Sequence, residues 1–374
     1  MSGTINLYSK LTTNDNYKLI QLVPELLKAL EDPAQELRFK ALDRDTSEVV
    51  LCSNDKTWVV KQKNHSNTVM LMKEFVPQEV VASEKLETFG MSAPTMDYLC
   101  FAKQTFELEP RPAKGQVDVS RLPIYHGDEK HFQEELMPKI TLQELFESSP
   151  CSKNEFDRIW FSLGGCTVNG FVCILASGFI SKSLHITLMS ILAENLDVNN
   201  LRLEETHQAV CKDMDDDEDF NPYSLEVIRT VLEKFCNKKD GGTYKLEMKQ
   251  VAKWYGVVAL KKFASKELIS QDEFMIKWKS LFPPYFSCDI DLNLLKGQFA
   301  RPLRGKLQYL PPSTLPHDIK DRFKMLFRIQ NTWDIEDIKP FIEDLNTRGL
   351  KIDNFVMKYA RRRKIGKQVL VSSR

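Results

Sequence analysis

Three helix starts in the sequence share one capping signature, and this signature constrains the fold more than any other feature of the chain. In each, a Ser or Thr is followed three residues later by Glu, within the segments 140–145 (ITLQEL), 151–156 (CSKNEF) and 269–274 (ISQDEF). The hydroxyl and the carboxylate each accept a hydrogen bond from a backbone N–H that the first helical turn leaves unpaired. The pattern therefore predicts helices that begin after Thr141, Ser152 and Ser270.

The first hundred residues have the periodicity of β-strands instead. Apolar and β-branched residues recur in four short segments, residues 37–43, 48–53, 57–62 and 67–73. Turn-forming residues separate the first three segments, and Asn54-Asp55 suits a tight hairpin. Closely spaced short strands favour an antiparallel meander or barrel, preceded here by one short helix at 22–32.

The predicted strands carry large apolar side chains but have little to cover them. A small sheet is stable only when another element covers it or when it closes on itself, and no long helix follows nearby. We therefore expect partner chains to complete the β region; a small barrel that is complete by itself is the alternative. The apolar residues expected to face the partners are Val49, Leu51, Trp58, Val60, Val69 and Leu71.

The middle of the chain changes from an irregular to a helical pattern. Residues 103–139 are rich in Pro, Glu, Lys and Gly, and we expect an irregular connector there. A strand pair that turns at Asn169-Gly170 is expected within 164–175. Six acids within residues 213–219 repel one another and should form an exposed linker. Helical spacing is found at 184–196, 221–235 and 248–263.

The last hundred residues contain further short helical patterns. Helices are expected around 274–281, 289–295, 319–327 and 335–345, with a kink at Pro340. Short helices in threes, followed by a strand or hairpin, are typical of winged-helix domains. We expect up to three such units, beginning near residues 136, 201 and 270.

The chain ends in a basic segment that continues a helical pattern. Four apolar residues between Ile352 and Tyr359 fall on one face of a helix predicted over 351–364, which Gly366 would stop before an apolar strand. This is the order of a recognition helix and its wing, so the segment predicts a DNA surface that contacts phosphates more than bases. A solubilising basic end is the alternative. The candidate DNA-binding residues are Lys358, Arg361, Arg362, Arg363, Lys364 and Lys367.

Composition and missing motifs argue against an enzyme. Lys and Arg together number 52, as do Asp and Glu, so the net charge does not indicate a polyanionic partner. No phosphate-binding loop, zinc-protease or serine-hydrolase motif occurs, and Cys151 and His185 are more simply structural residues. The eight cysteines lack CxxC or metal-ligand spacing, which predicts reduced thiols and no cofactor or metal. No apolar segment is long enough to span a membrane.

Several long strings resemble the Dcc-type family of sister chromatid cohesion proteins, which are non-catalytic subunits of the alternative replication factor C clamp loader. The strings span residues 38–72, 277–297 and 322–364 and begin RFKALDRDTSEVV, KWKSLFPPYFSCD and RFKMLFRIQNTWD. The similarity covers nearly the whole chain and looks closest to the budding-yeast form. It is weakest over residues 103–135 and over the acidic run.

The resemblance implies an α+β protein whose N-terminal β region joins a shared triple barrel and precedes tandem winged-helix domains. The other barrel segments would come from a small cohesion subunit and the C-terminal tail of the large clamp-loader subunit. This module would dock on the catalytic subunit of DNA polymerase epsilon, and the loader would act on the sliding clamp PCNA in the nucleus while other subunits hydrolyse ATP. The implied domains are residues 1–112, 113–200, 201–268 and 269–374.

Two other functions fit the same elements. A sequence-reading winged-helix transcription regulator would be complete by itself and would discriminate between DNA sequences. A scaffold of the ubiquitin-ligase type would use its winged helices to bind protein only. Whether the purified chain binds DNA, and with what sequence preference, separates these functions.

Overall fold

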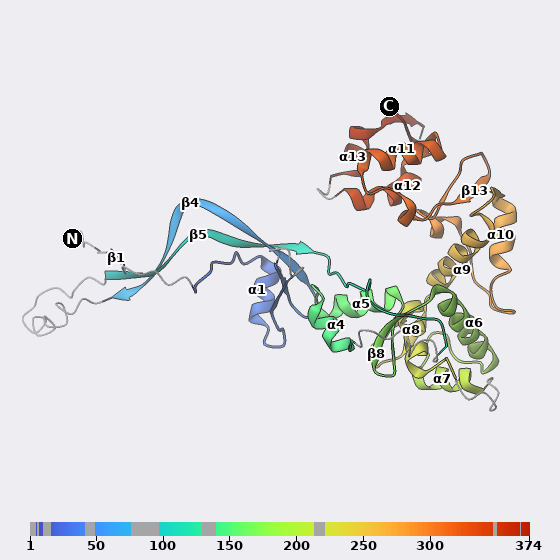
Figure 1. The fold of residues 1–374 in the computed structure, drawn as a ribbon, viewed down its shortest axis with the longest axis horizontal. Helices are drawn as coiled ribbons and strands as arrows, with labels where there is room; N and C mark the ends of the chain where they lie inside the picture. Colours follow the sequence, from blue (N-terminus) through green and yellow to red (C-terminus); the bar gives the residue numbers. More distant parts are fainter. Residues whose placement is uncertain are drawn as a thin grey trace, which may run out of the picture. The chain divides into compact units, whose positions relative to one another are not determined.

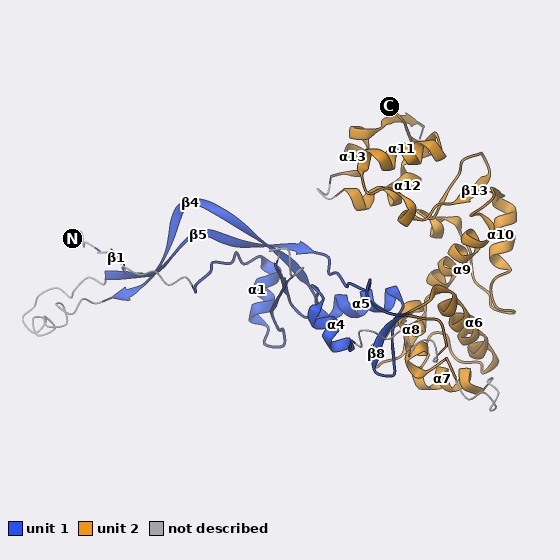
Figure 2. Ribbon diagram, in the orientation of Figure 1, with its two compact units in different colours: residues 1–123, 135–174 blue, residues 124–134, 175–374 orange. Residues whose placement is uncertain are grey.

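The computed structural model describes residues 5, 7–9, 16–41, 49–75, 97–128, 140–212, 221–346, 350–366 and 368–374. Over these residues the chain is an α+β protein, as the sequence predicts (Figure 1). It divides into two compact units, residues 1–123 with 135–174 and residues 124–134 with 175–374 (Figure 2). None of the described helices is both long and apolar enough to cross a membrane.

Unit 1 is built on a sheet of five strands: β1 (Leu7–Ser9), β2 (Arg38–Ala41), β3 (Val49–Cys52), β4 (Thr57–Phe75) and β5 (Asp97–Ala113). The order across the sheet is β1-β5-β4-β3-β2. Strands β2 to β5 are antiparallel neighbours, whereas β1 runs parallel to β5. The predicted antiparallel meander is therefore confirmed, but the described strands do not close into a barrel.

β4 is one strand where the sequence predicted two, at 57–62 and 67–73. The pairing of β4 with β5 shifts register between Asn64 and Val69, and this irregularity takes up the polar residues that separated the two predicted strands. β4 and β5 consequently run side by side as a long ribbon (Figure 1).

β5 lies where the sequence predicted an irregular connector from residue 103 onward. That prediction is wrong as far as Ala113. Pro110 and Pro112 argued against a strand, yet both pair with β4. They are tolerated because no strand that the structure describes lies against the other edge of β5 at these positions, so no ladder hydrogen bond is lost.

Helix α1 (Pro24–Glu31) covers one face of the sheet and confirms the short helix predicted at 22–32. Its Leu26 packs against Leu51 of β3 and Trp58 of β4, and all three side chains are buried. No long helix follows the strands closely in the sequence; the helix that covers them precedes them in the chain.

Helices α4 (Leu142–Ser148) and α5 (Lys153–Leu163) lie against the opposite face, the one that carries Lys40. Both begin with the predicted capping boxes, in which a hydroxyl and a Glu carboxylate each accept the backbone N–H of the other residue. The predicted hairpin follows as β7 (Gly165–Val168) and β8 (Phe171–Leu175).

The turn of this hairpin has the predicted chemistry. Asn169 and Gly170 have φ values of 52° and 84°. A two-residue turn with both φ values positive matches the twist of the flanking strands, and Asn-Gly is the pair that adopts it most readily.

Unit 2 repeats one order of elements three times: a helix, a short strand, further helical segments and a two-stranded hairpin. The first repeat contains α6 (Ser177–Ala193), α7 (Leu203–Lys212), α8 (Leu225–Phe235), β9 (Cys236–Lys238) and β10 (Tyr244–Leu246). Leu201 takes the place of the short strand and forms one antiparallel bridge with Tyr244.

The other two repeats have complete short strands. The second contains α9 (Met248–Phe263), β11 (Ile269–Ser270), α10 (Gln271–Lys279), η2 (Leu292–Leu295), β12 (Phe299–Ala300) and β13 (Lys306–Tyr309). The third contains α11 (Ile319–Ile329), β14 (Thr332–Asp334), α12 (Ile335–Ile338), η4 (Lys339–Phe341), η5 (Glu343–Leu345), α13 (Ile352–Tyr359), β15 (Arg361–Ile365) and β16 (Gln368–Ser372).

The pairing of strands is the same in all three repeats. The last strand of the hairpin lies between the first strand of the hairpin and the short strand that follows the first helix. Ile269 thus pairs with Leu307 in the second repeat, and Trp333 pairs with Val371 in the third. Each small sheet therefore ties the start of its repeat to its end.

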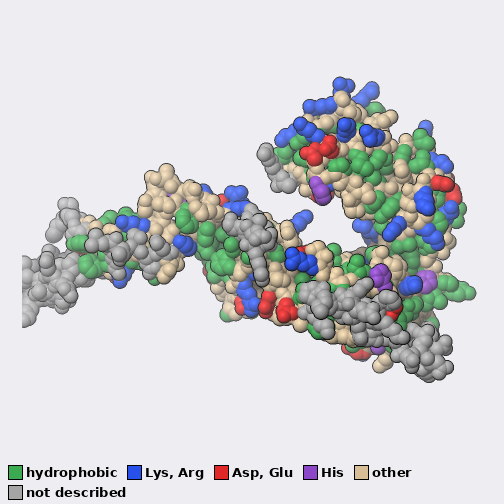
Figure 3. Space-filling model, viewed as in Figure 1, with side chains coloured by type: hydrophobic (Ala, Val, Ile, Leu, Met, Phe, Trp, Pro, Cys, Tyr) green, Lys and Arg blue, Asp and Glu red, His purple; other side chains and the backbone are tan. Residues whose placement is uncertain are grey.

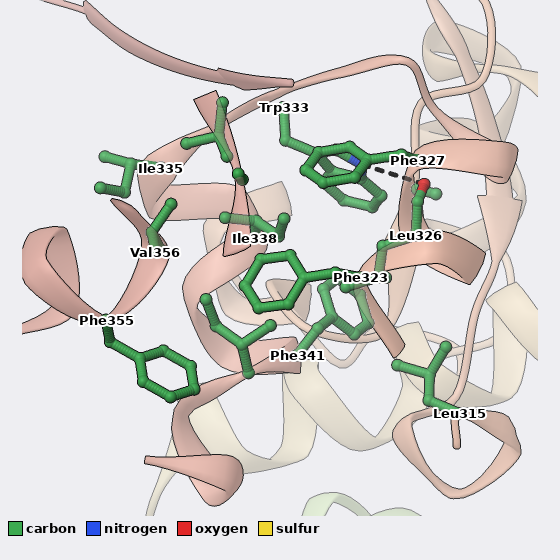
Figure 4. Close-up of a cluster of buried hydrophobic side chains, with 14 of the residues drawn as sticks. Leu315, Phe323, Leu326, Phe327, Trp333, Ile335, Ile338, Phe341, Phe355 and Val356 are labelled. Atoms are coloured by element: carbon green, nitrogen blue, oxygen red, sulfur yellow. Dashed lines mark hydrogen bonds between the residues drawn. The ribbon is translucent and has the colours of Figure 1, made fainter. Parts of the chain in front are cut away.

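The third repeat is held by a large aromatic core (Figure 4). Trp333 is buried on β14, and its indole N–H donates to the carbonyl of Leu326 in α11 at 3.1 Å. The ring of Phe341 packs edge-on against Trp333, with 5.6 Å between the ring centroids. This core anchors α11, α12 and the sheet to one another.

Several helix boundaries in unit 2 differ from the predicted ones. α6 begins at Ser177 rather than at residue 184. α8 begins after Ser224, whose hydroxyl accepts the N–H of Val227, and not at Asn221. The helix expected at 289–295 is only the short 3₁₀ segment η2.

The start of α10 is correct in position but differs in its cap. The Ser270 hydroxyl accepts the N–H of Glu273, as predicted. The Glu273 carboxylate instead forms an ion pair with Lys277, one turn further along, at 2.7 Å. The acidic run predicted to be a linker, residues 213–219, lies outside the described residues.

Candidate functional site

The basic segment at the end of the chain lies on a strand rather than on the predicted helix. α13 ends at Tyr359, because Ala360 is buried and adopts an extended conformation (φ −137°, ψ 167°). Arg361, Arg362, Arg363 and Lys364 follow on β15, and all four are exposed. The prediction that one helix runs through residue 364 is therefore wrong.

The other members of the candidate set are placed as follows. Lys358 is exposed in the last turn of α13. Gly366, expected to stop the helix, instead lies beside the turn between β15 and β16, with φ 58°. The predicted strand after it is confirmed as β16. Lys367 lies outside the described residues.

The register of β15 on β16 divides the basic residues between two faces of the sheet. Arg362 lies opposite Val371, which is fully buried in the core of the repeat. Because successive strand residues point to opposite faces, Arg361 and Arg363 share the face directed away from that core. The structure therefore brings Arg361 and Arg363 together and separates them from Arg362 and Lys364.

The charges of this segment are only slightly neutralised. Arg362 Nε lies 3.3 Å from Asp353 Oδ1 of α13. Within the described residues no acidic side chain forms an ion pair with Lys358, Arg361, Arg363 or Lys364. Figure 3 shows Lys and Arg side chains gathered over the last part of the chain. The segment can hold anionic groups such as phosphates.

The apolar residues predicted to face partner chains also divide into two sets. Leu51 and Trp58 are buried beneath α1 within unit 1, with exposed fractions of 4% and 1%. Val60 packs against the same cluster and Leu71 is half-buried. Val49 and Val69 are open to solvent, at 36% and 40%.

A long free strand edge is the feature that the sequence analysis missed. β3 pairs only with residues Thr57–Val60 of β4, whereas β4 continues to Phe75. Among the described strands, none pairs with residues 62–75 on that side. Unpaired N–H and C=O groups along such an edge are a template for a strand from another chain. The alternation of apolar residues in β5 could have indicated this edge. It predicts a second long strand that pairs with β4 on one side, which leaves the other side of β4 beyond β3 open.

A second missed feature joins the sheet to α4 and α5. The Lys40 ammonium donates to the carbonyls of Phe146, Ser149 and Cys151 at 2.8, 3.0 and 3.1 Å. It also lies 3.7 Å from the centre of the Phe146 ring. Burial lowers the pKa of Lys40. Lys40 therefore adds a charged donor to carbonyls at the end of α4 and in the following turn, two of which also accept a backbone N–H, those of Phe146 and Ser149.

Glu155 makes the matching connection at the start of α5. Its carboxylate accepts from the Thr57 hydroxyl at 2.5 Å and from the Gly115 N–H at 3.3 Å. Gly115 is needed for this approach, because a Cβ atom there would lie 2.4 Å from the Cβ of Cys151. Glu155 thus links α5 to both β4 and the segment after β5.

The cysteines give no indication of catalysis. Burial raises the pKa of Cys151 and of Cys236 to about 12, so both are thiols at neutral pH and poor nucleophiles. All eight cysteines are unpaired. No group of three or more His, Cys, Asp or Glu residues suited to a metal ion occurs in the described part of the chain.

Comparison with known proteins identifies similar sequences over nearly the full length. The family model described as "Sister chromatid cohesion protein Dcc1" matches residues 17–342. Sister chromatid cohesion protein DCC1 of Saccharomyces cerevisiae is 50% identical over 99% of this chain and 100% of the relative. The proteins of the same name from mouse and human are 25% and 24% identical over 92% of this chain, covering 84% and 85% of the relatives. The family match ends before α13, so the role of the basic strand must be argued from its geometry.

Proposed function

The chain belongs to the Dcc1 family of sister chromatid cohesion proteins, and on this premise we propose that it is a non-catalytic subunit of an alternative replication factor C clamp loader. In this role its N-terminal sheet joins the loader and its C-terminal repeats bind DNA. The assembly acts on PCNA at replication forks in the nucleus and contacts the catalytic subunit of DNA polymerase epsilon. Other subunits hydrolyse ATP, because this chain has no phosphate-binding loop.

The free edge of β4 is the observation that carries this proposal. An edge of about fourteen residues is a liability for a protein that acts alone, because it invites pairing with other chains. In a subunit the same edge supplies main-chain hydrogen bonds for added strands, and the neighbouring side chains supply specificity. The proposed added strands belong to the small cohesion subunit and to the C-terminal tail of the large subunit.

The burial of side chains in the sheet reduces the set of residues proposed to contact these partners. Trp58 and Leu51 already pack beneath α1, so they support the sheet from within. Val69 and Met70 are 40% and 46% exposed beside the free edge and point to opposite faces of the ribbon. We assign the partner contacts chiefly to this part of β4.

Hydrogen exchange on the full-length chain tests the proposed assembly. Without partners, amides of residues 62–75 that point away from β5 should exchange rapidly, because no described strand protects them. Adding the two partner segments should slow these amides by about tenfold or more. Val69→Asp should weaken assembly, whereas Leu303→Asp, at an exposed apolar position of unit 2, should not. Full protection of residues 62–75 in the free chain contradicts the proposal.

The three repeats of unit 2 are proposed to be winged-helix units. The supporting observation is their common order, in which a short strand after the first helix pairs with the last strand of a terminal hairpin. These units comprise residues 177–246, 248–309 and 319–372, whereas the sequence pattern placed unit starts near residues 136, 201 and 270. In the third unit, α13 holds the position of the recognition helix and the β15–β16 hairpin holds that of the wing.

Binding of DNA is proposed for this third unit, through phosphate contacts of its basic hairpin. Arg361 and Arg363 share an exposed face and have no acidic partner in the described structure. Arg362 contributes less, because Asp353 already pairs with its guanidinium. Such contacts do not read bases, so affinity should be similar for unrelated DNA sequences.

Two matched double variants of the full-length chain test this assignment. Arg361→Glu with Arg363→Glu should weaken duplex binding more than Arg362→Glu with Lys364→Glu, although both pairs change the net charge equally. Arg361→Ala with Arg363→Ala should lower the slope of log affinity against log salt by up to about 1.8, or 0.9 per lost phosphate contact. Anisotropy titrations of unrelated duplexes over a range of salt concentrations measure both effects. A strong preference for one sequence favours a transcription regulator instead, and no DNA binding favours a protein scaffold.

A further inference from the structure

A basic groove lies on the surface of the third repeat, and no residue of β15 lines it. It is a hollow of about 370 Å³ between α11, the end of α13 and the last residues of the chain. Its lining combines cations and aromatic rings: Lys320, Lys324, Arg328, Arg374, Ser373, Phe323, Phe327 and Tyr359. We call this hollow the α11 groove.

The floor of the α11 groove is apolar and packs on the core of the repeat. The rings of Phe323 and Tyr359 stack with 5.6 Å between centroids, and Phe327 stacks on Phe323 at 6.0 Å. Phe323 and Phe327 belong to the buried core of the repeat, with exposed fractions of 3% and 8%. The floor therefore exists before any ligand binds, so a ligand does not have to order it.

The rim of the α11 groove carries a row of exposed cations. Lys320, Lys324 and Arg328 are spaced four residues apart on α11, so they project from one side of the helix about 6 Å from one another. No ion pair joins these three side chains to an acid within the described residues. The acids of this helix start lie elsewhere: Asp318 caps α11, and Asp321 falls on a neighbouring row.

We propose that the α11 groove is a docking site for an acidic peptide segment of a partner protein that carries one large apolar side chain. The apolar side chain would enter the hollow above Phe323, Phe327 and Tyr359, and Asp or Glu residues beside it would pair with the row of cations. Peptide recognition commonly joins an apolar anchor in a pocket to flanking charge pairs.

A nucleic acid would use only part of this surface. Phosphates need the cations but have no apolar group to fill the hollow. A base could stack only on the partly exposed ring of Tyr359, because Phe323 and Phe327 are almost completely buried, whereas an apolar side chain can fill the hollow without stacking. The apolar floor beneath the charged rim therefore favours a peptide. This site is independent of the DNA contacts proposed for β15, and either assignment can fail alone.

The test uses the full-length chain and a short fluorescein-labelled peptide with one Phe flanked by Asp and Glu. Lys320→Glu, Lys324→Glu and Arg328→Glu together should raise the Kd by about tenfold or more. The matched control reverses three exposed lysines of α9, Lys249, Lys253 and Lys261, and should change the Kd by less than about twofold. Replacing Phe by Ala in the peptide should weaken binding about tenfold, because the anchor is lost.

A fourth variant separates the hollow from the charges. Ser373→Trp fills the groove at an exposed position near the end of the chain and leaves every cation in place, so it should weaken the peptide without unfolding the repeat. Retained peptide binding by this variant, or equal losses in the α11 and α9 variants, overturns the proposal. A third result would also overturn it. If the peptide does not bind the unmodified chain and the triple Glu variant of α11 loses duplex DNA binding, the groove is a surface for phosphates.

Discussion

Replacing Trp58 by alanine is expected to destabilise the N-terminal sheet by roughly 3–5 kcal/mol, the usual cost of removing a large aromatic side chain from a core. Trp58 is 1% exposed and packs with Leu26 of α1 and Leu51 of β3. Its loss leaves a cavity between helix and sheet that the small cluster cannot close. Urea denaturation of the full-length chain, followed by hydrogen exchange in residues 49–60, measures the change.

Val69→Ala is the matched control for this variant. Val69 lies on the same strand but is 40% exposed, so its truncation should cost less than about 1 kcal/mol in the free chain. When only the folded fraction of each variant is compared, Val69→Ala should weaken partner binding more than Trp58→Ala, because Val69 lies beside the free edge. Equal stability of the two variants would show that Trp58 does not belong to a core of this chain and would restore its predicted role as a partner contact.

Lys40→Met is expected to separate α4 from the sheet. The variant keeps most of the aliphatic side chain but removes the donor shared by three carbonyls, those of Phe146, Ser149 and Cys151. Hydrogen bonds to a charged group contribute more than neutral ones, and we expect a loss of roughly 2–3 kcal/mol. Faster amide exchange throughout α4, with β4 and β5 unchanged, is the corresponding measurement.

Lys103→Met provides the control for Lys40→Met. Lys103 is exposed on β5 of the same sheet, so this variant makes the same chemical change without removing the hydrogen bonds of Lys40 to α4 and the turn after it. It should leave exchange in α4 unaltered. If Lys40→Met also leaves α4 unaltered, the carbonyls obtain equivalent partners from water and Lys40 does not hold the helix in place.

Features that depend on neighbouring residues could be predicted from the sequence. The hydroxyls of Thr141 and Ser152 and the turn at Asn169-Gly170 each act on backbone groups within three residues of themselves. Their chemistry is complete in a short segment, so tertiary packing had little to change. α9 was also predicted correctly from local spacing, because its predicted limits, residues 248–263, match the structure.

Features that depend on distant residues could not be predicted in this way. Arg361 to Lys364 have helical propensity, but pairing with β16 and the burial of Ala360 place them on a strand. The arginine-rich segment is therefore exposed, as expected, but its basic side chains do not share one helix face. The geometry of the strand divides them between the two faces of the sheet. Similarly, the part of β5 from residue 103 onward was predicted to be an irregular connector, because residues 103–139 are rich in Pro, Glu, Lys and Gly. Its proline residues are acceptable in a strand only because that edge of β5 is free.

The candidate partner surface shows the same limit. Trp58 and Val69 have equally apolar surroundings in the sequence, and only the position of α1 decides that one is covered and the other exposed. The free edge of β4 depends on where β3 ends, which is a property of the whole sheet. A pattern of apolar residues shows that cover is needed, but it does not show whether the same chain provides it.

The hydrogen bonds between Lys40 and the carbonyls around the end of α4 have a consequence for the order in which the protein folds on the ribosome. Its carbonyl acceptors follow Lys40 by 106 to 111 residues, an interval of about 5–20 s at ordinary rates of synthesis. During that interval the face of the sheet that carries Lys40 and Val50 has emerged without the helices that bury it. A nascent chain released or stalled before α5 is complete would expose this face together with the edges of β2 and β4, and would be prone to aggregate. The first strands to be synthesised are thus among the last to reach their final packing.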